Sequence, residues 1–153
     1  MKLIPFTHQD YAALRGFMQP LWLETYGSFL PREQILFLLD KYFLPENISR
    51  FLKDGYRYFW IDDVGVLVYV EREKEVYIDK LYLLPAARGH GYAKFVFDQL
   101  LRHKKDVTLN VNQSNTRAVA CYKKNGFTVD ETVAINLGNG MTNHDYVMRK
   151  RYE

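Results

Sequence analysis

Residues 76–101 read VYIDKLYLLPAARGHGYAKFVFDQLL, and this stretch decides the fold. Its first part is apolar, aromatic and β-branched, and Pro85 closes it, which predicts a long strand. Its last part carries apolar side chains at helical spacing, namely Ala93, Val96, Phe97, Leu100 and Leu101. Gly89 and Gly91 lie between the two parts. We therefore predict a strand followed by a helix, with a glycine turn between them.

The glycine turn has the features of an anion site. The first N–H groups of a helix have no partner within the helix, and the helix dipole adds partial positive charge there. Gly89 and Gly91 have no side chain to keep a phosphate from the backbone, and Arg88 and Lys94 add positive charge nearby. The alternative is a turn whose glycines serve backbone geometry alone. The sequence has neither G-K-S/T nor G-x-G-x-x-G, which argues against a P-loop and the usual dinucleotide fingerprint.

The rest of the chain alternates between helical and strand patterns in one predicted domain, residues 1–153. Thr7 and Asp10 have the spacing of a capping box, so we expect a helix that begins there and ends near Pro20. Further helices are expected at 31–44, 46–55 and 115–125, and strands at 2–6, 56–61, 64–71, 107–111, 127–137 and 145–150. This order predicts a mixed α/β fold.

Composition narrows the class of protein. With 48% hydrophobic and 25% charged residues, the sequence is typical of a soluble globular protein. The net charge of +3 and the scattered basic residues argue against binding to nucleic acid. Cys121 is the only cysteine and the four histidines show no ligand spacing, so we expect neither a disulfide nor a metal. Without a membrane-length apolar run or a signal peptide, we expect a cytoplasmic protein that binds no membrane.

Two motifs together resemble the signatures of the GNAT N-acetyltransferase superfamily. Residues 88–93, RGHGYA, fit the pattern Q/R-x-x-G-x-G/A that binds the acetyl-CoA pyrophosphate in that family. Residues 111–127, VNQSNTRAVACYKKNGF, resemble its second signature through Asn115, Ala118, Tyr122, Gly126 and Phe127. The resemblance covers nearly the whole chain and implies a mostly antiparallel, twisted sheet flanked by helices, with acetyl-CoA as cosubstrate. The segments LETY, ILFLLDKYFLPENI and DYVMRK further resemble bacterial polyamine (spermidine/spermine) acetyltransferases.

The resemblance also implies that acetyl-CoA binds where the strand that ends at Leu83 diverges from the strand that begins at Val107. The end of the first strand would pair with the pantetheine amides as an added strand does. Asn115 would hydrogen-bond the same arm, and His90 would offer only its backbone N–H. The implied cofactor-binding residues are Leu81, Tyr82, Leu83, Arg88, Gly89, His90, Gly91, Tyr92, Ala93, Lys94 and Asn115.

Tyr122 is the candidate proton donor for the thiolate that leaves when the acetyl group is transferred. It lies two helical turns after Asn115 on one helix face. A tyrosine hydroxyl with an ordinary pKa of ~10 is protonated at pH 7, as an acid must be. The family resemblance implies the same role. The alternative is a tyrosine that only packs on its helix.

Asp79 is the candidate proton acceptor, which is needed because a free alkylamine is mostly protonated at neutral pH. Strand alternation predicts one face made of Tyr77, Asp79, Leu81 and Leu83. Several members of the family carry a carboxylate on this strand, and Asp79 would act through water. A structural ion pair is the alternative role for Asp79, and His144 and Glu24 are further candidates for the base.

Rings and acidic groups between the first strand and the first hairpin predict a pocket for the acceptor. The expected acceptor-binding residues are Trp22, Glu24, Tyr26 and Tyr42, with Asp40 as a second acidic group and Phe43 in the core. Cys121 is expected to take no part, because the family transfers the acetyl group directly. The expected reaction is acetyl transfer to a primary amine, with a small amine or polyamine favoured. A protein or peptide N-acetyltransferase and an acyl-CoA sensor without turnover are the alternatives, and either a monomer or a homodimer is compatible with the sequence.

Overall fold

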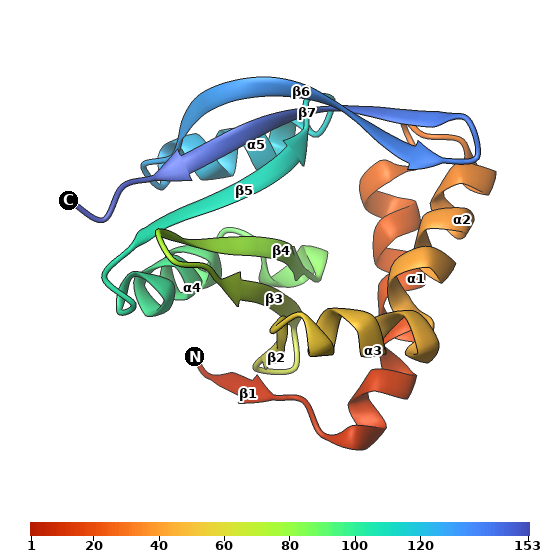
Figure 1. Cartoon of the computed structure of the whole chain (residues 1–153), viewed down its shortest axis with the longest axis horizontal. Helices are drawn as coiled ribbons and strands as arrows, with labels where there is room; N and C mark the ends of the chain where they lie inside the picture. Colours follow the sequence, from red (N-terminus) through yellow and green to blue (C-terminus); the bar gives the residue numbers. More distant parts are fainter.

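The computed structural model describes residues 1–153 and contains a seven-stranded sheet with helices on both faces (Figure 1). The strand order is β1-β2-β3-β4-β5-β7-β6, and only β4 and β5 run parallel. The predicted mixed, mostly antiparallel fold is therefore confirmed. None of its helices has the length and apolar character needed to cross a membrane. The elements are β1 (Leu3–Pro5), α1 (His8–Tyr26), α2 (Arg32–Phe43), α3 (Pro45–Lys53), β2 (Arg57–Ile61), β3 (Gly65–Glu71), β4 (Glu75–Leu83), the 3-10 helix η1 (Pro85–Ala87), α4 (Tyr92–Leu101), β5 (Asp106–Asn112), α5 (Thr116–Lys124), β6 (Thr128–Gly138) and β7 (Met141–Lys150).

Each face of the sheet has its own hydrophobic core. Helices α4 and α5 cover one face over a cluster that includes Phe97 and Met148, both fully buried. Helices α1, α2 and α3 cover the other face over a second cluster, which includes Leu39. The tip of the β6–β7 hairpin joins this second core, where Lys41 Nζ donates to the carbonyl oxygen of Leu137 at 2.7 Å. The sheet is thus the middle layer between two groups of helices.

Helix α1 is longer than predicted, because it continues through Pro20 to Tyr26. Proline has no N–H to donate to the carbonyl of Gly16 and costs about 3 kcal/mol inside a helix. Leu21 and Trp22, which follow it, are buried against the second core. Burying two such side chains contributes about 1.5–3 kcal/mol each, so packing outweighs the proline. The prediction that the helix ends near Pro20 is therefore wrong.

Strand β4 carries a β-bulge at Asp79. In its pairing with β3, Ile78 lies opposite Tyr69 and Lys80 lies opposite Val68, so Asp79 has no partner on β3. An extra residue of this kind bends the strand and interrupts the alternation of its side chains. The bulge lies in the middle of the strand that the sequence singled out.

The bulge changes which side chains share a face of β4. Leu81 and Leu83 pack against the core under α4 and α5, whereas Tyr82 packs against the core under α1 and α2. Tyr77, before the bulge, lies on the opposite side to Ile78, which belongs to the first core. The prediction of a single face for Tyr77, Asp79, Leu81 and Leu83 is therefore wrong, because simple alternation does not hold across an inserted residue.

The sheet opens between β4 and β5 directly after the bulge. The parallel pairing of these strands runs from Glu75 with Asp106 to Ile78 with Leu109 and then stops. Figure 1 shows the two strands diverging from this point, with β5 following β7 instead. Residues 80–83 are consequently paired with β3 on one side, and residues 79–83 pair with no strand on the other. The predicted divergence of the two strands is confirmed.

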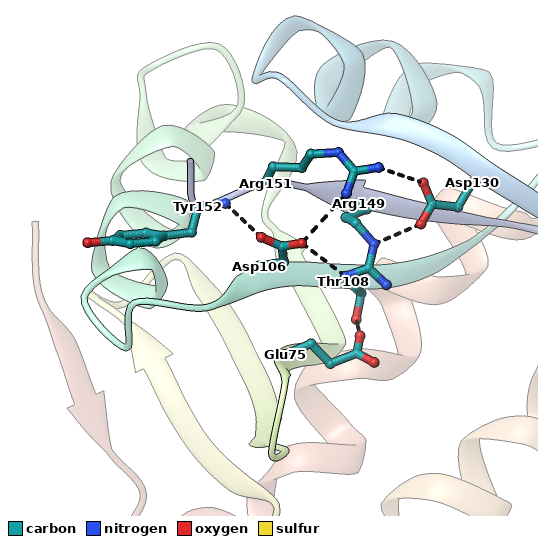
Figure 2. Close-up of polar contacts among 7 residues, drawn as sticks. All are labelled: Glu75, Asp106, Thr108, Asp130, Arg149, Arg151 and Tyr152. Atoms are coloured by element: carbon teal, nitrogen blue, oxygen red, sulfur yellow. Dashed lines mark hydrogen bonds and ion pairs between the residues drawn. The ribbon is translucent and has the colours of Figure 1, made fainter.

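A polar network links the strands at the end of the sheet where β4 and β5 are still paired (Figure 2). Thr108 Oγ1 of β5 donates to the carboxylate of Glu75 on β4. Arg149 of β7 reaches Asp106 of β5 at 3.2 Å and Asp130 of β6 at 2.8 Å. Four neighbouring strands are therefore linked by side chains where the opening begins.

We expect Arg149→Met to destabilise the fold by about 1–2 kcal/mol, because it leaves two partly buried carboxylates without their shared cation. Arg151→Met is the matched control, since Arg151 is 64% exposed and its carboxylate contacts are 3.8 and 4.0 Å long. Exposed pairs contribute about 0–1 kcal/mol. Thermal and urea unfolding measure both variants. An equal loss of stability in the two variants would mean that removing Arg149 has no effect beyond the loss of one positive charge.

Candidate active site

The turn between β4 and α4 depends on glycine geometry. Gly89 has φ +78° and Gly91 has φ +87°, in the left-handed region that side chains disfavour. Gly91 caps α4, and its carbonyl accepts from the N–H of Phe95 at 3.0 Å. The N–H groups of the first turn before Phe95 remain available to a ligand. A Cβ placed on Gly89 would meet no atom within 4 Å, so the space beside this turn is open.

Arg88, the predicted pyrophosphate ligand, forms a bidentate ion pair with Glu24 of α1. Its Nη1 and Nη2 lie 3.0 and 3.2 Å from the two carboxylate oxygens, and Arg117 Nη1 lies 3.5 Å from Glu24 Oε1. The hydrogen bond from Arg88 is the main cause that lowers the pKa of Glu24. The structure therefore places Glu24 beside the glycine turn and not in the predicted acceptor pocket. Asp40, the second acidic candidate, pairs with Arg15 at 2.7 Å outside this region.

A cavity of about 720 Å³ occupies the opening between β4 and β5 and extends toward α1 and α2. All the cofactor-binding, catalytic and acceptor-binding residues that the sequence predicts line it, except Glu24, Asp40 and His90. The side chain of His90 is exposed outside the cavity, and so is that of His144, the alternative base. We call the part of the cavity beside the glycine turn and α5 the cofactor end, and the part beside α1 and α2 the acceptor end, after the ligands predicted for them. The cofactor end is lined by Leu81, Leu83, Arg88, Gly89, Gly91, Tyr92, Ala93, Lys94, Asn115 and Tyr122. The acceptor end is lined by Trp22, Tyr26, Tyr42, Tyr77, Asp79, Lys80, Tyr82, Asn110, Asn143 and Asp145.

Asn115 and Tyr122 lie on α5 at the cofactor end. Asn115 is buried, and its Oδ1 caps the helix by accepting from the N–H of Ala118 at 3.4 Å, so its amide nitrogen is the group left for a ligand. Tyr122 packs on Phe97 and Phe127, with ring centroids 6.1 and 5.7 Å away, while its hydroxyl makes no hydrogen bond within the protein. Burial, with a smaller contribution from the nearby Tyr26, raises the pKa of Tyr122 well above that of free tyrosine. Tyr122 thus remains a proton donor at any physiological pH.

Asp79 and Lys80 both reach the acceptor end because of the bulge. Lys80 Nζ lies 2.8 Å from Asp79 Oδ2 and 4.4 Å from the centroid of the Tyr42 ring. Only Oδ2 of Asp79 is used in this pair, which leaves Oδ1 without a protein partner. The ion pair that the sequence offered as the alternative to a catalytic role therefore exists. Sequence reasoning missed Lys80, because unbroken alternation assigns it to the opposite face from Asp79.

Aromatic side chains form the wall of the acceptor end. The hydroxyls of Tyr26 and Tyr82 hydrogen-bond to each other, and the Trp22 ring lies 5.4 and 5.7 Å from these two rings. Burial is the main cause that raises the pKa of Tyr26 to about 12, and burial also raises the pKa of Tyr82 well above its ordinary value. These tyrosines are therefore neutral at neutral pH. The side chain of Tyr82 packs beside Trp22 and Tyr26 in the cavity wall, although the sequence assigned this residue to the cofactor through its backbone.

Asp145 of β7 is a site residue that sequence reasoning missed. It lines the cavity and is only 7% exposed, and its Oδ1 is buried with no hydrogen-bond partner. Burial raises the pKa of Asp145, and the neighbouring His144 opposes this in part. The only sequence signal was an acidic residue at the start of the apolar strand segment DYVMRK. That signal gave no indication of which way the side chain faces.

An open strand edge, a glycine turn at a helix N-terminus and a partly buried tyrosine thus share one cavity, as the resemblance to the GNAT superfamily implies. The chain belongs to the acetyltransferase (GNAT) family, whose sequence profile matches residues 14–127. The crystal structure of the PaiA N-acetyltransferase from Thermoplasma acidophilum, in complex with coenzyme A, has the same fold. Its TM-score is 0.75 at 19% identity, over 99% of this chain and 98% of that one.

Two curated proteins are similar to this chain over part of their length. An uncharacterized N-acetyltransferase of Mycobacterium tuberculosis is 40% identical over 81 residues, which are 50% of this chain and 51% of that protein. The peptidyl-lysine N-acetyltransferase YjaB of Salmonella typhimurium is 34% identical over 86 residues, which are 56% of this chain and 59% of that protein. The chain thus spans little more than half the length of the curated relatives it matches.

Proposed function

We propose that the protein is an acetyl-CoA-dependent N-acetyltransferase that acts on the primary amine of a small, positively charged acceptor. The observation that carries the proposal is the shared cavity, in which a phosphate-type turn and an open strand edge meet a ring-lined, acidic end. The family membership supports acetyl transfer as the reaction. The cavity volume of about 720 Å³ and the aromatic lining of the acceptor end support a small molecule over a folded protein surface.

The residues at the cofactor end fit acetyl-CoA, which supplies the activated acetyl thioester. The free N–H groups at the start of α4, together with Arg88, Arg117 and Lys94, would hold the diphosphate. Arg88 and Arg117 would then exchange their contacts with Glu24 for contacts with phosphate oxygens. The unpaired edge of residues 79–83 would hydrogen-bond the pantetheine amides.

The proton transfers follow from the two ends of the cavity. Asp79 Oδ1 would take a proton from the acceptor ammonium through water, which leaves a neutral amine able to attack. As the N–C bond forms and the C–S bond breaks, the Tyr122 hydroxyl would donate a proton to the sulfur. The second proton that the nitrogen loses would return through water to the Tyr122 oxygen, and the proton on Asp79 would pass to solvent. Cys121 has no part in this sequence, because burial raises the pKa of its thiol and keeps it a poor nucleophile.

We expect Asp79→Asn to lower kcat about 10- to 100-fold at pH 7, because the variant cannot accept the proton. The deficit should shrink as the pH approaches ~10, where an alkylamine loses its proton without help. The pH dependence of kcat measures this, with Asp54→Asn on the exposed end of α3 as the control. A deficit of the same size at every pH would instead assign Asp79 to the structural ion pair with Lys80.

Release of free thiol from acetyl-CoA in the presence of a panel of amines tests the function itself. The panel contains small monoamines, polyamines and lysine-containing peptides, because the similarity to a peptidyl-lysine N-acetyltransferase makes peptides the second candidate acceptor. The proposal expects the highest kcat/KM for a small amine. Peptides as the best acceptors would overturn the small-molecule part. Tight acetyl-CoA binding with no release for any amine would show a sensor instead of an enzyme.

A further inference from the structure

Asp145 faces the cavity, and no positively charged side chain pairs with its carboxylate. It is paired through the backbone with Val133 on β6 and Asn112 on β5, and neither neighbour carries a charge. Neither of its carboxylate oxygens has a hydrogen-bond partner in the protein, and Oδ1 is fully buried. Its neighbour in sequence, His144, has an exposed side chain.

The groups across the cavity from Asp145 do not neutralise it. The charge of Asp145 adds to burial, the larger cause, in raising the pKa values of Tyr26, Tyr42 and Tyr77, so these rings lie near it and remain neutral. The lysines on the surrounding elements are engaged elsewhere. Lys80 pairs with Asp79 at 2.8 Å, and Lys41 Nζ donates to the Leu137 carbonyl at 2.7 Å.

The balance of charge at the acceptor end indicates what can bind there. Asp79 and Lys80 cancel each other, which leaves the carboxylate of Asp145 as the one unbalanced charge among the residues that line this end. A buried carboxylate without a partner is costly, and such groups are found where a ligand supplies the missing partner. Trp22, Tyr26 and Tyr42 around it offer faces suited to the apolar stem and charged head of an alkylammonium.

We propose that Asp145 binds the ammonium group of the acceptor and thereby selects acceptors that carry one positive charge inside the cavity. This inference rests on the proposed function and adds a residue that determines its substrate class. Asp145 has the binding role, and Asp79 with its free Oδ1 has the proton-accepting role. The two carboxylates should therefore affect different kinetic constants.

The test compares Asp145→Asn with the wild type, using the best alkylamine from the panel and an arylamine, which is uncharged at neutral pH. We expect the KM for the alkylamine to rise about 10- to 100-fold, the value of one charge-assisted hydrogen bond. The KM for the arylamine and the kcat at saturating alkylamine should change little. Asp79→Asn should show the opposite pattern, with kcat reduced more than KM is raised. An equal rise in KM for both amines, or no rise, would overturn the proposal.

A binding measurement separates this inference from the proposed function. In the absence of acetyl-CoA, n-butylamine hydrochloride should raise the Tm of the wild type and not that of Asp145→Asn, with sodium chloride at equal concentration as the control. The variant alone should melt at or above the wild-type Tm, because it lacks an unpartnered buried charge. A wild type that releases no thiol with any amine would refute the proposed function alone. An equal butylamine shift in both proteins would refute the role of Asp145.

Discussion

The Tyr122→Phe variant should turn over acetyl-CoA about 10²–10³ times more slowly than the wild type, with little change in its affinity for acetyl-CoA. Phenylalanine keeps the ring that packs on Phe97 and Phe127 and removes only a hydroxyl without a protein partner. The fold should therefore be unaffected, and the loss should fall on kcat. Steady-state kinetics with the best amine, together with calorimetric binding of CoA, measure the two effects separately.

Tyr11→Phe provides the control for this variant, since Tyr11 lies in a separate aromatic cluster with Phe6 and Tyr58. Unchanged turnover in Tyr122→Phe would rule out the hydroxyl as the acid. The wild type offers an independent check through pH. A raised pKa means that Tyr122 keeps its proton to higher pH than free tyrosine does, so kcat should show no loss from its ionisation below pH ~10. A fall in kcat near pH 8 that is seen in the wild type and not in Tyr122→Phe would mean that Tyr122 ionises near pH 8. That result would contradict its raised pKa.

Gly91→Val should weaken acetyl-CoA binding at least ~10²-fold. At φ +87° a β-branched residue costs on the order of 1–3 kcal/mol, so the turn is expected to change conformation and carry the first N–H groups of α4 away from the diphosphate. The new side chain would also lie in the cavity lining, where its Cβ comes within 3.8 Å of the Met1 methyl group. Calorimetric titration with CoA measures the loss directly.

Gly55→Val is the control for the effect of backbone strain alone. Gly55 has φ +90°, follows α3 and does not line the cavity, so the substitution introduces a similar strain away from the site. Both variants should have a lower Tm, whereas only Gly91→Val should lose affinity for CoA. Equal affinities in the two variants would refute the diphosphate role of the glycine turn.

The parts of the fold that were predictable have local signals. The capping box is one example, because Thr7 N–H donates to Asp10 Oδ2 at 2.7 Å as the spacing indicates. The strand, glycine turn and helix of residues 76–101 also follow from short-range patterns. The course of α1 past Pro20 could not be predicted in this way, since it depends on burial of Leu21 and Trp22 against residues distant in sequence.

The site was predictable where a motif fixes backbone geometry and less so where side-chain direction matters. Glu24 and Arg88 are 64 positions apart, and nothing in either segment indicates that they meet. The bulge at Asp79 is a property of pairing with β3, so Lys80 could not be assigned to the acceptor end from its own strand. The orientation of Asp145 depends on the register of β7 with two other strands.

One side of residues 79–83 pairs with no strand, so the sheet has a free strand edge between β4 and β5. Edges of this kind usually pair with another polypeptide, but here helical residues such as Trp22, Tyr26 and Tyr122 line the cavity beside the edge. A molecule that binds only the folded chain adds about 2.7 kcal/mol of stability at one hundred times its Kd. If acetyl-CoA binds this edge as proposed, the lifetime of the protein against proteolysis should follow the supply of acetyl-CoA.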